Sequence, residues 1–318
     1  MKTKSVVRVV IVVVCLISLL AAFSSCKQAS KSTEQGQHKI RVVATLFPLY
    51  DMARNIGGDK AEVSLLLPPG VEAHSFEPKP GDIIKVSEAD IFIYTGKFME
   101  PWAEGIIKST ANKKLIVIDA SQGTKMILSQ FHDADEPAGS LDPHIWLDFD
   151  NAKTMVRNIA QAFQVKDSTN KVFYEQKTDA YSNKLTELDS AFKTTLAGCQ
   201  NREIVYGGHY AFGYLANRYG LKYLAAQGVS PDSEPTAKDL VRLVKQIRKN
   251  RIKYIFYEEL TSSKIAETIA GETSAKMLLL NAAHNLSKDE FEKGVSFLDI
   301  LKRDLDNLKA GLECRSSK

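Results

Sequence analysis

The sequence predicts an α/β fold made of two similar lobes, each with a mostly parallel sheet, joined by one long rigid α-helix. Two series of short apolar runs alternate with helical segments along the chain. Short continuous runs of this kind are typical of parallel strands that are buried on both faces. Between the two series, residues 170–196 contain no Gly or Pro and carry a helical pattern. This order of elements argues for two α/β lobes and a helical connector.

The first series covers residues 39–168 and alternates strands with helices. Its strands are β-branched or continuously apolar, which favours the extended conformation. One of its helices ends at Gly57-Gly58, because glycine can adopt the left-handed conformation that closes a helix. We therefore predict strands at 39–45, 62–67, 90–94 and 115–118, and helices at 49–56, 79–88 and 151–163.

The connector, residues 169–198, is predicted as a single amphipathic helix. Its apolar residues recur at spacings of four, three, four and four, which places them on one face of a helix. A helix of about 27 residues spans about 40 Å, enough to run along both lobes. Such a connector is stiffer than a Gly-rich linker, so it permits rocking of the lobes more readily than a wide hinge opening. The stripe consists of Tyr181, Leu185, Leu188, Phe192 and Leu196.

The second series covers residues 199–318 and repeats the pattern of the first. Thr236 is a good N-cap for one of its helices, with Asp239 three residues further on. We predict strands at 204–206, 222–225, 254–257 and 277–280, and helices at 210–219, 236–249, 262–273 and 293–312.

The N-terminus indicates export. Three basic residues precede an apolar run of about 15 residues, a length that suits a secretory signal and is short for a membrane-spanning helix. The run ends in Phe23-Ser24-Ser25-Cys26, which resembles a bacterial lipoprotein signal. That resemblance implies that residues 1–25 are removed and that Cys26 is lipidated, followed by a flexible polar tether over 26–38. An uncleaved anchor is the alternative, and both place the remaining chain outside the cytoplasm.

Composition and cysteine content narrow the class of protein. The chain is 44% hydrophobic and 25% charged, which is ordinary for a soluble globular protein. Its net charge is only +4, so nothing indicates binding to nucleic acid. An oxidising compartment favours a disulfide between Cys199 and Cys314, worth up to ~4–5 kcal/mol in the chain-entropy model. Two buried free thiols are the alternative.

Four isolated histidines are the candidate functional residues. Imidazole is the commonest protein ligand for a borderline-soft divalent metal. In open α/β sheets, ligands bind outside the carboxyl ends of the strands. Each of the four histidines comes after a predicted strand, two in each lobe, so a shared site in the cleft between the lobes is expected. The alternative for any one of them is an ordinary core or surface histidine. The four are His74, His144, His209 and His284.

We do not expect the other two histidines to be metal ligands. His132 lies in the acidic stretch Phe131–Glu136, which we interpret as a solvated surface turn. His38 stands at the boundary of the tether and is taken as incidental.

Four motifs include or follow the candidate histidines: His74-Ser-Phe-Glu-Pro-Lys-Pro-Gly-Asp82, Asp142-Pro-His-Ile-Trp-Leu147, His209-Tyr-Ala-Phe-Gly-Tyr-Leu215 with Arg218-Tyr-Gly-Leu221, and Glu234-Pro-Thr236. They resemble the motifs of one family, the zinc- and manganese-specific solute-binding proteins of bacterial ABC transporters. The resemblance runs from about Ile40 to Leu312. It implies two α/β lobes joined by a long helix, one metal ion in the cleft, and the first three ligands at His74, His144 and His209.

The fourth ligand is the position at which members of this family differ. Similar members carry Glu where His284 stands, so we expect His284 to be the fourth ligand. Asn281, a water molecule or Glu258 are the alternatives. Four neutral nitrogens form a tetrahedral site that suits Zn²⁺, whereas Mn²⁺ prefers carboxylate oxygen. Glu72 or Glu77 could orient the imidazoles, or both could be solvated loop acids.

The expected function follows from these residues and from the resemblance. We expect a monomeric, membrane-anchored, extracytoplasmic protein that binds Zn²⁺ and delivers it to an ABC permease. A manganese-binding relative is the nearest alternative. A zinc-dependent hydrolase is the alternative from another class, but the sequence contains no HExxH-type pair and no evident carboxylate base beside the histidines. A surface adhesin is a third alternative, because some relatives carry that label, but no residue of this sequence indicates adhesion.

Overall fold

The computed structural model describes residues 39–129, 139–229 and 234–315. The predicted signal over 1–25, the tether over 26–38 with Cys26 and His38, and His132 lie outside these residues. Within the described part of the chain, no helix combines the length and the apolar character needed to cross a membrane.

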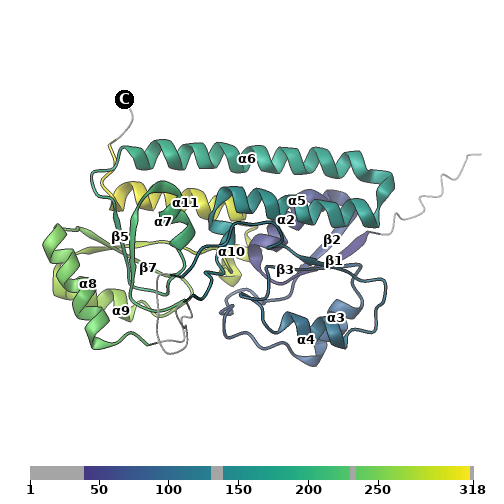
Figure 1. The fold of residues 1–318 in the computed structure, drawn as a ribbon, viewed down its shortest axis with the longest axis horizontal. Helices are drawn as coiled ribbons and strands as arrows, with labels where there is room; N and C mark the ends of the chain where they lie inside the picture. Colours follow the sequence, from purple (N-terminus) through teal and green to yellow (C-terminus); the bar gives the residue numbers. More distant parts are fainter. Residues whose placement is uncertain (1–38, 130–138, 230–233, 316–318) are drawn as a thin grey trace, which may run out of the picture. The chain divides into compact units, whose positions relative to one another are not determined.

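The described chain contains two four-stranded parallel sheets with the same topology (Figure 1). The strand order is β2-β1-β3-β4 in the first sheet and β6-β5-β7-β8 in the second. Every pair of neighbouring strands in both sheets is parallel. The predicted fold class is thereby confirmed. The strands are β1 Ile40–Ala44, β2 Ala61–Leu65, β3 Ile91–Tyr94, β4 Ile116–Asp119, β5 Glu203–Tyr206, β6 Lys222–Ala225, β7 Tyr254–Tyr257 and β8 Lys276–Leu279.

Helices cover both faces of the first sheet. Alternate residues of β1 point to opposite faces, so Val42 and Val43 belong to different apolar clusters. Val42 packs in the cluster that contains α2 (Phe47–Gly57) and α5 (Phe149–Lys166). Val43 packs in the cluster that contains α3 (Pro80–Ser87) and α4 (Ala103–Ser109). This two-sided burial explains why the strands are continuously apolar in sequence.

The second sheet is covered in the same way. Val205 of β5 packs in a cluster with residues of α8 (Ala237–Asn250) and α9 (Lys264–Thr273). Its neighbour Tyr206 packs on the other face, in the cluster that includes α7 (Gly213–Tyr219) and α11 (Phe297–Gly311). Thr236 caps α8 and forms the expected capping box with Asp239.

The long connector is α6, Lys171–Ala197, with 27 residues. Figure 1 shows it running past both sheets, and it packs on α2 and α5 of the first lobe and on α11 of the second. All five residues of the predicted stripe are buried. In the middle of the helix, the hydroxyl of Tyr181 donates a 2.8 Å hydrogen bond to the buried carboxylate of Asp51 in α2. The connector is therefore fixed to the lobes by packing along its length.

Some boundaries differ from the predicted ones. α7 begins at Gly213 instead of residue 210, and the backbone N–H groups of Tyr210 and Ala211 before it bond to Gly228 O and Tyr223 Oη. α11 begins at Phe297 instead of residue 293, because Gly294 has a φ of 71° and Ser296 caps the helix. α4 was not predicted, nor were α10 (Lys288–Glu292) and the 3₁₀ helices η1 Gly58–Lys60, η2 Ile145–Leu147 and η3 Ser168–Asn170.

A disulfide joins Cys199 to Cys314 across 115 positions of sequence. Cys199 follows the end of α6, and Cys314 follows the end of α11. The bond therefore ties the start of the second lobe to its last helix.

Candidate metal centre

The four candidate histidines lie beyond the carboxyl ends of strands from both sheets. His74 follows β2 and His144 follows β4 in the first lobe, while His209 follows β5 and His284 follows β8 in the second. His144, His209 and His284 are buried, and His74 is partly exposed. The strand order places β1 and β3 side by side, the kind of switch point at which α/β sheets bind ligands.

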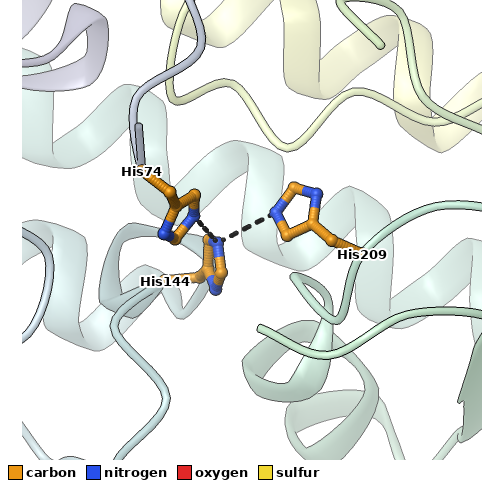
Figure 2. Close-up of side chains that lie close together, drawn as sticks. All are labelled: His74, His144 and His209. Atoms are coloured by element: carbon orange, nitrogen blue, oxygen red, sulfur yellow. Dashed lines mark hydrogen bonds between the residues drawn. The ribbon is translucent and has the colours of Figure 1, made fainter. Parts of the chain in front are cut away.

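Three of the imidazoles converge (Figure 2). The Nε2 atom of His144 lies 3.3 Å from Nε2 of His74 and 3.2 Å from Nε2 of His209. Zn–N bonds of 2.0–2.1 Å in a tetrahedral site place neighbouring nitrogens about 3.3 Å apart. The spacing of the three nitrogens is thus that of ligands around a common metal ion.

The hydrogen bonds made by Nδ1, on the other side of each ring, determine whether Nε2 of His144 and of His209 carries a proton or a lone pair. Nδ1 of His144 lies 2.9 Å from Asp142 Oδ1, and Nδ1 of His209 lies 2.8 Å from Glu258 Oε2. A carboxylate only accepts hydrogen bonds, so each neutral ring donates its single proton from Nδ1. The two Nε2 atoms then face each other as lone pairs. Such an arrangement is repulsive by itself and is relieved by a cation between the rings.

His284 supplies a fourth imidazole at the same place. Its ring centroid is 5.7 Å from that of His209 and 6.3 Å from that of His74. A nitrogen of His284 also clusters with His209 and Glu258 at ligand-to-ligand spacing. Neither ring nitrogen has a hydrogen-bond partner among the residues that the structure describes, although the side chain is buried. An unpaired buried polar group is costly, so His284 fits a metal ligand better than a core residue.

The two protein alternatives to His284 differ in how far their side chains are occupied. Asn281 donates from Nδ2 to Glu259 Oε2 at 2.5 Å and accepts the backbone N–H of Ala283 at 2.8 Å, so both ends of its amide are occupied. Glu258 uses Oε2 to hold His209. Its Oε1 is buried without a hydrogen-bond partner among the described residues, and Glu258 lies at ligand spacing with His209 and His284. Glu258 therefore orients His209 and keeps one oxygen that can reach an ion bound beside these two rings.

The carboxylates that hydrogen-bond to the histidine rings differ from the two expected from the sequence, Glu72 and Glu77. Glu72 accepts the backbone N–H groups of His74 and Ser75 at 2.6 and 3.0 Å, so it shapes the loop without orienting a ring by hydrogen bond. Glu77 is exposed. Asp142, which orients His144, was not singled out, although its position two residues before His144 was visible in the sequence.

Burial and charge set the protonation of the four rings. Burial and the neighbouring imidazoles lower the pKa of His74 and of His144 well below the ordinary value. Burial lowers the pKa of His284 to about 4. Burial opposes protonation of His209 too, but the charge and hydrogen bond of Glu258 outweigh it and raise the pKa of His209. Three rings are therefore held neutral near pH 7, and His209 is the one that holds a proton most readily.

The chain is similar to known zinc-uptake and zinc-binding proteins. Residues 42–311 match the family model of the periplasmic zinc-uptake complex component A, ZnuA. The high-affinity zinc uptake system protein ZnuA of Bacillus subtilis is 36% identical over 305 residues, with 94% of this chain and 95% of that protein covered. The zinc-binding protein AdcA of Streptococcus pyogenes is 32% identical, and the chain spans 60% of its length.

A solved structure shows the same fold. The Zn(II)-bound ZnuA-like domain of AdcA from Streptococcus pneumoniae has a TM-score of 0.74 at 32% identity, over 86% of this chain and 99% of that domain. The family match covers both lobes and the connector. This chain therefore belongs to the family of periplasmic zinc-uptake component A, whose members are solute-binding proteins of ABC importers and not enzymes.

Proposed function

We propose that this chain binds one Zn²⁺ through His74, His144, His209 and His284 and hands the ion to the permease of its importer. The observation that carries the assignment is the convergence of three Nε2 atoms at 3.2–3.3 Å beside a buried imidazole without a hydrogen-bond partner. Zn²⁺ is the cargo of this site, and the residues that hold it come from both lobes.

The donor set supports Zn²⁺ over Mn²⁺. Four imidazole nitrogens match the tetrahedral preference of Zn²⁺, whereas Mn²⁺ favours carboxylate oxygen and binds most weakly in the divalent series. The nearby carboxylates of Asp142 and Glu258 are directed at ring Nδ1 atoms. They fix each ring and balance part of the charge of the ion without replacing a nitrogen ligand.

Calorimetry on chelator-stripped protein tests the assignment. We expect a dissociation constant for Zn²⁺ far tighter than micromolar and a large loss of affinity in His144→Ala. A dissociation constant no tighter than micromolar, or unchanged affinity in His144→Ala, would refute it. Elemental analysis of the purified protein under Zn/Mn competition measures the preference, and recovery of Mn²⁺ from an equimolar mixture would overturn the choice of Zn²⁺.

Membrane attachment and oligomeric state form a separate part of the proposal. Lipidation of Cys26 would hold the protein at the outer face of a membrane, and the polar segment 27–37 would let it reach the permease as a monomer. Metabolic labelling with a fatty acid is expected to mark the wild-type protein and not Cys26→Ser. Sedimentation of the mature domain is expected to give the mass of a single chain.

A further inference from the structure

The segment 282–286, which carries His284, belongs to the second lobe by chain order but hydrogen-bonds to the first lobe. Two backbone amides of the first lobe donate into it: Gly70 N–H to Leu286 O at 2.8 Å, and Phe47 N–H to His284 O at 3.2 Å. A tryptophan side chain of the first lobe adds a third bond, from Trp146 Nε1 to Ala282 O at 2.8 Å.

The side chain of Asn285 makes two further hydrogen bonds to the first lobe. Its Nδ2 donates to Pro68 O at 2.8 Å and to Val71 O at 2.7 Å, both in the loop that leads to His74. Its Oδ1 accepts the N–H of Leu286 at 2.9 Å. The side chain of Asn285 is fully buried, although its two acceptors belong to residues on the surface of the first lobe. One amide thus fixes the segment of one ligand, His284, to the loop of another, His74.

The two residues before this segment are anchored in the second lobe. Leu280 O accepts from Tyr206 Oη at 3.0 Å, and Asn281 N–H donates to Asp304 Oδ1 at 2.9 Å. The change of partners coincides with a bend at Ala283, whose φ of 59° is uncommon for a residue other than glycine. The chain therefore passes from the partners of one lobe to those of the other between Asn281 and Ala283.

From this change of partners we infer that His284 moves with the first lobe, and that Asn285 is the positioning residue that keeps it there. The inference rests on the proposed function for its consequence in zinc binding. When the lobes rock apart, His74, His144 and His284 stay together as a three-nitrogen site, and His209 alone withdraws with the second lobe. Release then begins with the loss of one ligand instead of two.

Asn158 offers a matched control. Its Nδ2 also donates to two backbone carbonyls, Ala120 O and Gln122 O at 3.1 and 2.9 Å, but both lie in its own lobe. The change Asn158→Ala thus removes the same chemistry without touching the junction between the lobes. Trp146→Phe keeps an aromatic ring and removes only the N–H that bonds to Ala282, so it serves as a second variant if Asn285→Ala folds poorly.

The first experiment is amide hydrogen exchange of Gly70, measured by NMR on zinc-free protein. We expect exchange of the Gly70 N–H to accelerate at least tenfold in Asn285→Ala and to stay unchanged in Asn158→Ala. In the wild type, removal of zinc should leave Gly70 protected while Ile127 N–H, which donates to Tyr214 Oη of the second lobe, exchanges faster. Unchanged Gly70 exchange in Asn285→Ala, or joint loss of protection at Gly70 and Ile127 without zinc, would overturn the inference.

The second experiment measures the rate at which a chelator removes Zn²⁺. Asn285→Ala and Trp146→Phe should release zinc about tenfold faster than the wild type, and Asn158→Ala within about twofold of it. Equal rates in Asn285→Ala and Asn158→Ala would contradict the positioning role. If the wild type bound no Zn²⁺, the proposed function would fail, yet the exchange of Gly70 would still decide where the segment 282–286 belongs.

Discussion

His144 and His209 come from different lobes, and their Nε2 atoms lie 3.2 Å apart. Each ring is fixed from behind by a carboxylate, Asp142 for His144 and Glu258 for His209. Both nitrogens therefore present lone pairs to the same point. In the proposed site, a cation bound between these two rings would turn a repulsive contact between the lobes into two metal–nitrogen bonds.

Replacing the fourth imidazole should weaken zinc binding and open the coordination sphere. Structural zinc sites contribute roughly 10–16 kcal/mol, so one ligand of four is worth about 3 kcal/mol, or about 100-fold in affinity. We expect His284→Ala to lose at least that factor in a chelator competition and to admit water in the spectrum of the Co²⁺ form. His132→Ala, in the acidic stretch, is the control. Equal affinity of His284→Ala and the wild type would exclude His284 as a ligand.

Removing an orienting carboxylate should cost affinity without removing a ligand. Asp142→Asn and Glu258→Gln keep side-chain size, but they no longer hold the Nδ1 proton of His144 or His209 with a charged acceptor. Losses of about 10–100-fold in zinc affinity are expected. Glu77→Gln, in an exposed acid of the His74 loop, should bind as the wild type does. An equal loss in all three variants would point to a general charge effect.

The pKa pattern predicts a shallow dependence of zinc affinity on pH. Zinc must displace the proton from a protonated imidazole, and the pKa of His209 is raised while that of His284 is about 4 and those of His74 and His144 are lowered. As pH falls through the pKa of His209, affinity should fall about tenfold per unit, with one proton released per ion down to about pH 4. Ordinary imidazoles would all protonate near 6.5 and give a steeper loss. Calorimetry in buffers of different ionisation enthalpy counts the protons, and a count of two or more near pH 6 would contradict this pattern.

The disulfide should stabilise the fold without contributing to the site. Closing the 115-residue separation between Cys199 and Cys314 is expected to contribute about 2–5 kcal/mol to the free energy of unfolding. The double variant Cys199→Ser/Cys314→Ser should unfold at correspondingly lower urea concentration while keeping wild-type zinc affinity. Two free thiols in the unreduced wild-type protein would show that the bond does not form.

The fold could be predicted largely from sequence because its strands are buried on both faces and carry a continuous apolar signal. Helix starts were less predictable where the residues before a helix bond to distant partners: Tyr210 N–H bonds to Gly228 O just before α7, and local pattern does not encode that pairing. At the site, the histidines could be located by their places after strands. The role of Glu258 could not be predicted, because its partner His209 is 49 positions away and local pattern does not encode that pairing.

His74 differs from the other candidate ligands in being partly exposed, while His144, His209 and His284 are sealed from water. In the proposed site, the side of His74 is therefore the one that solvent reaches. In the proposed release, withdrawal of His209 frees a coordination position, and the side of His74 is the one from which a chelator or the permease would reach it.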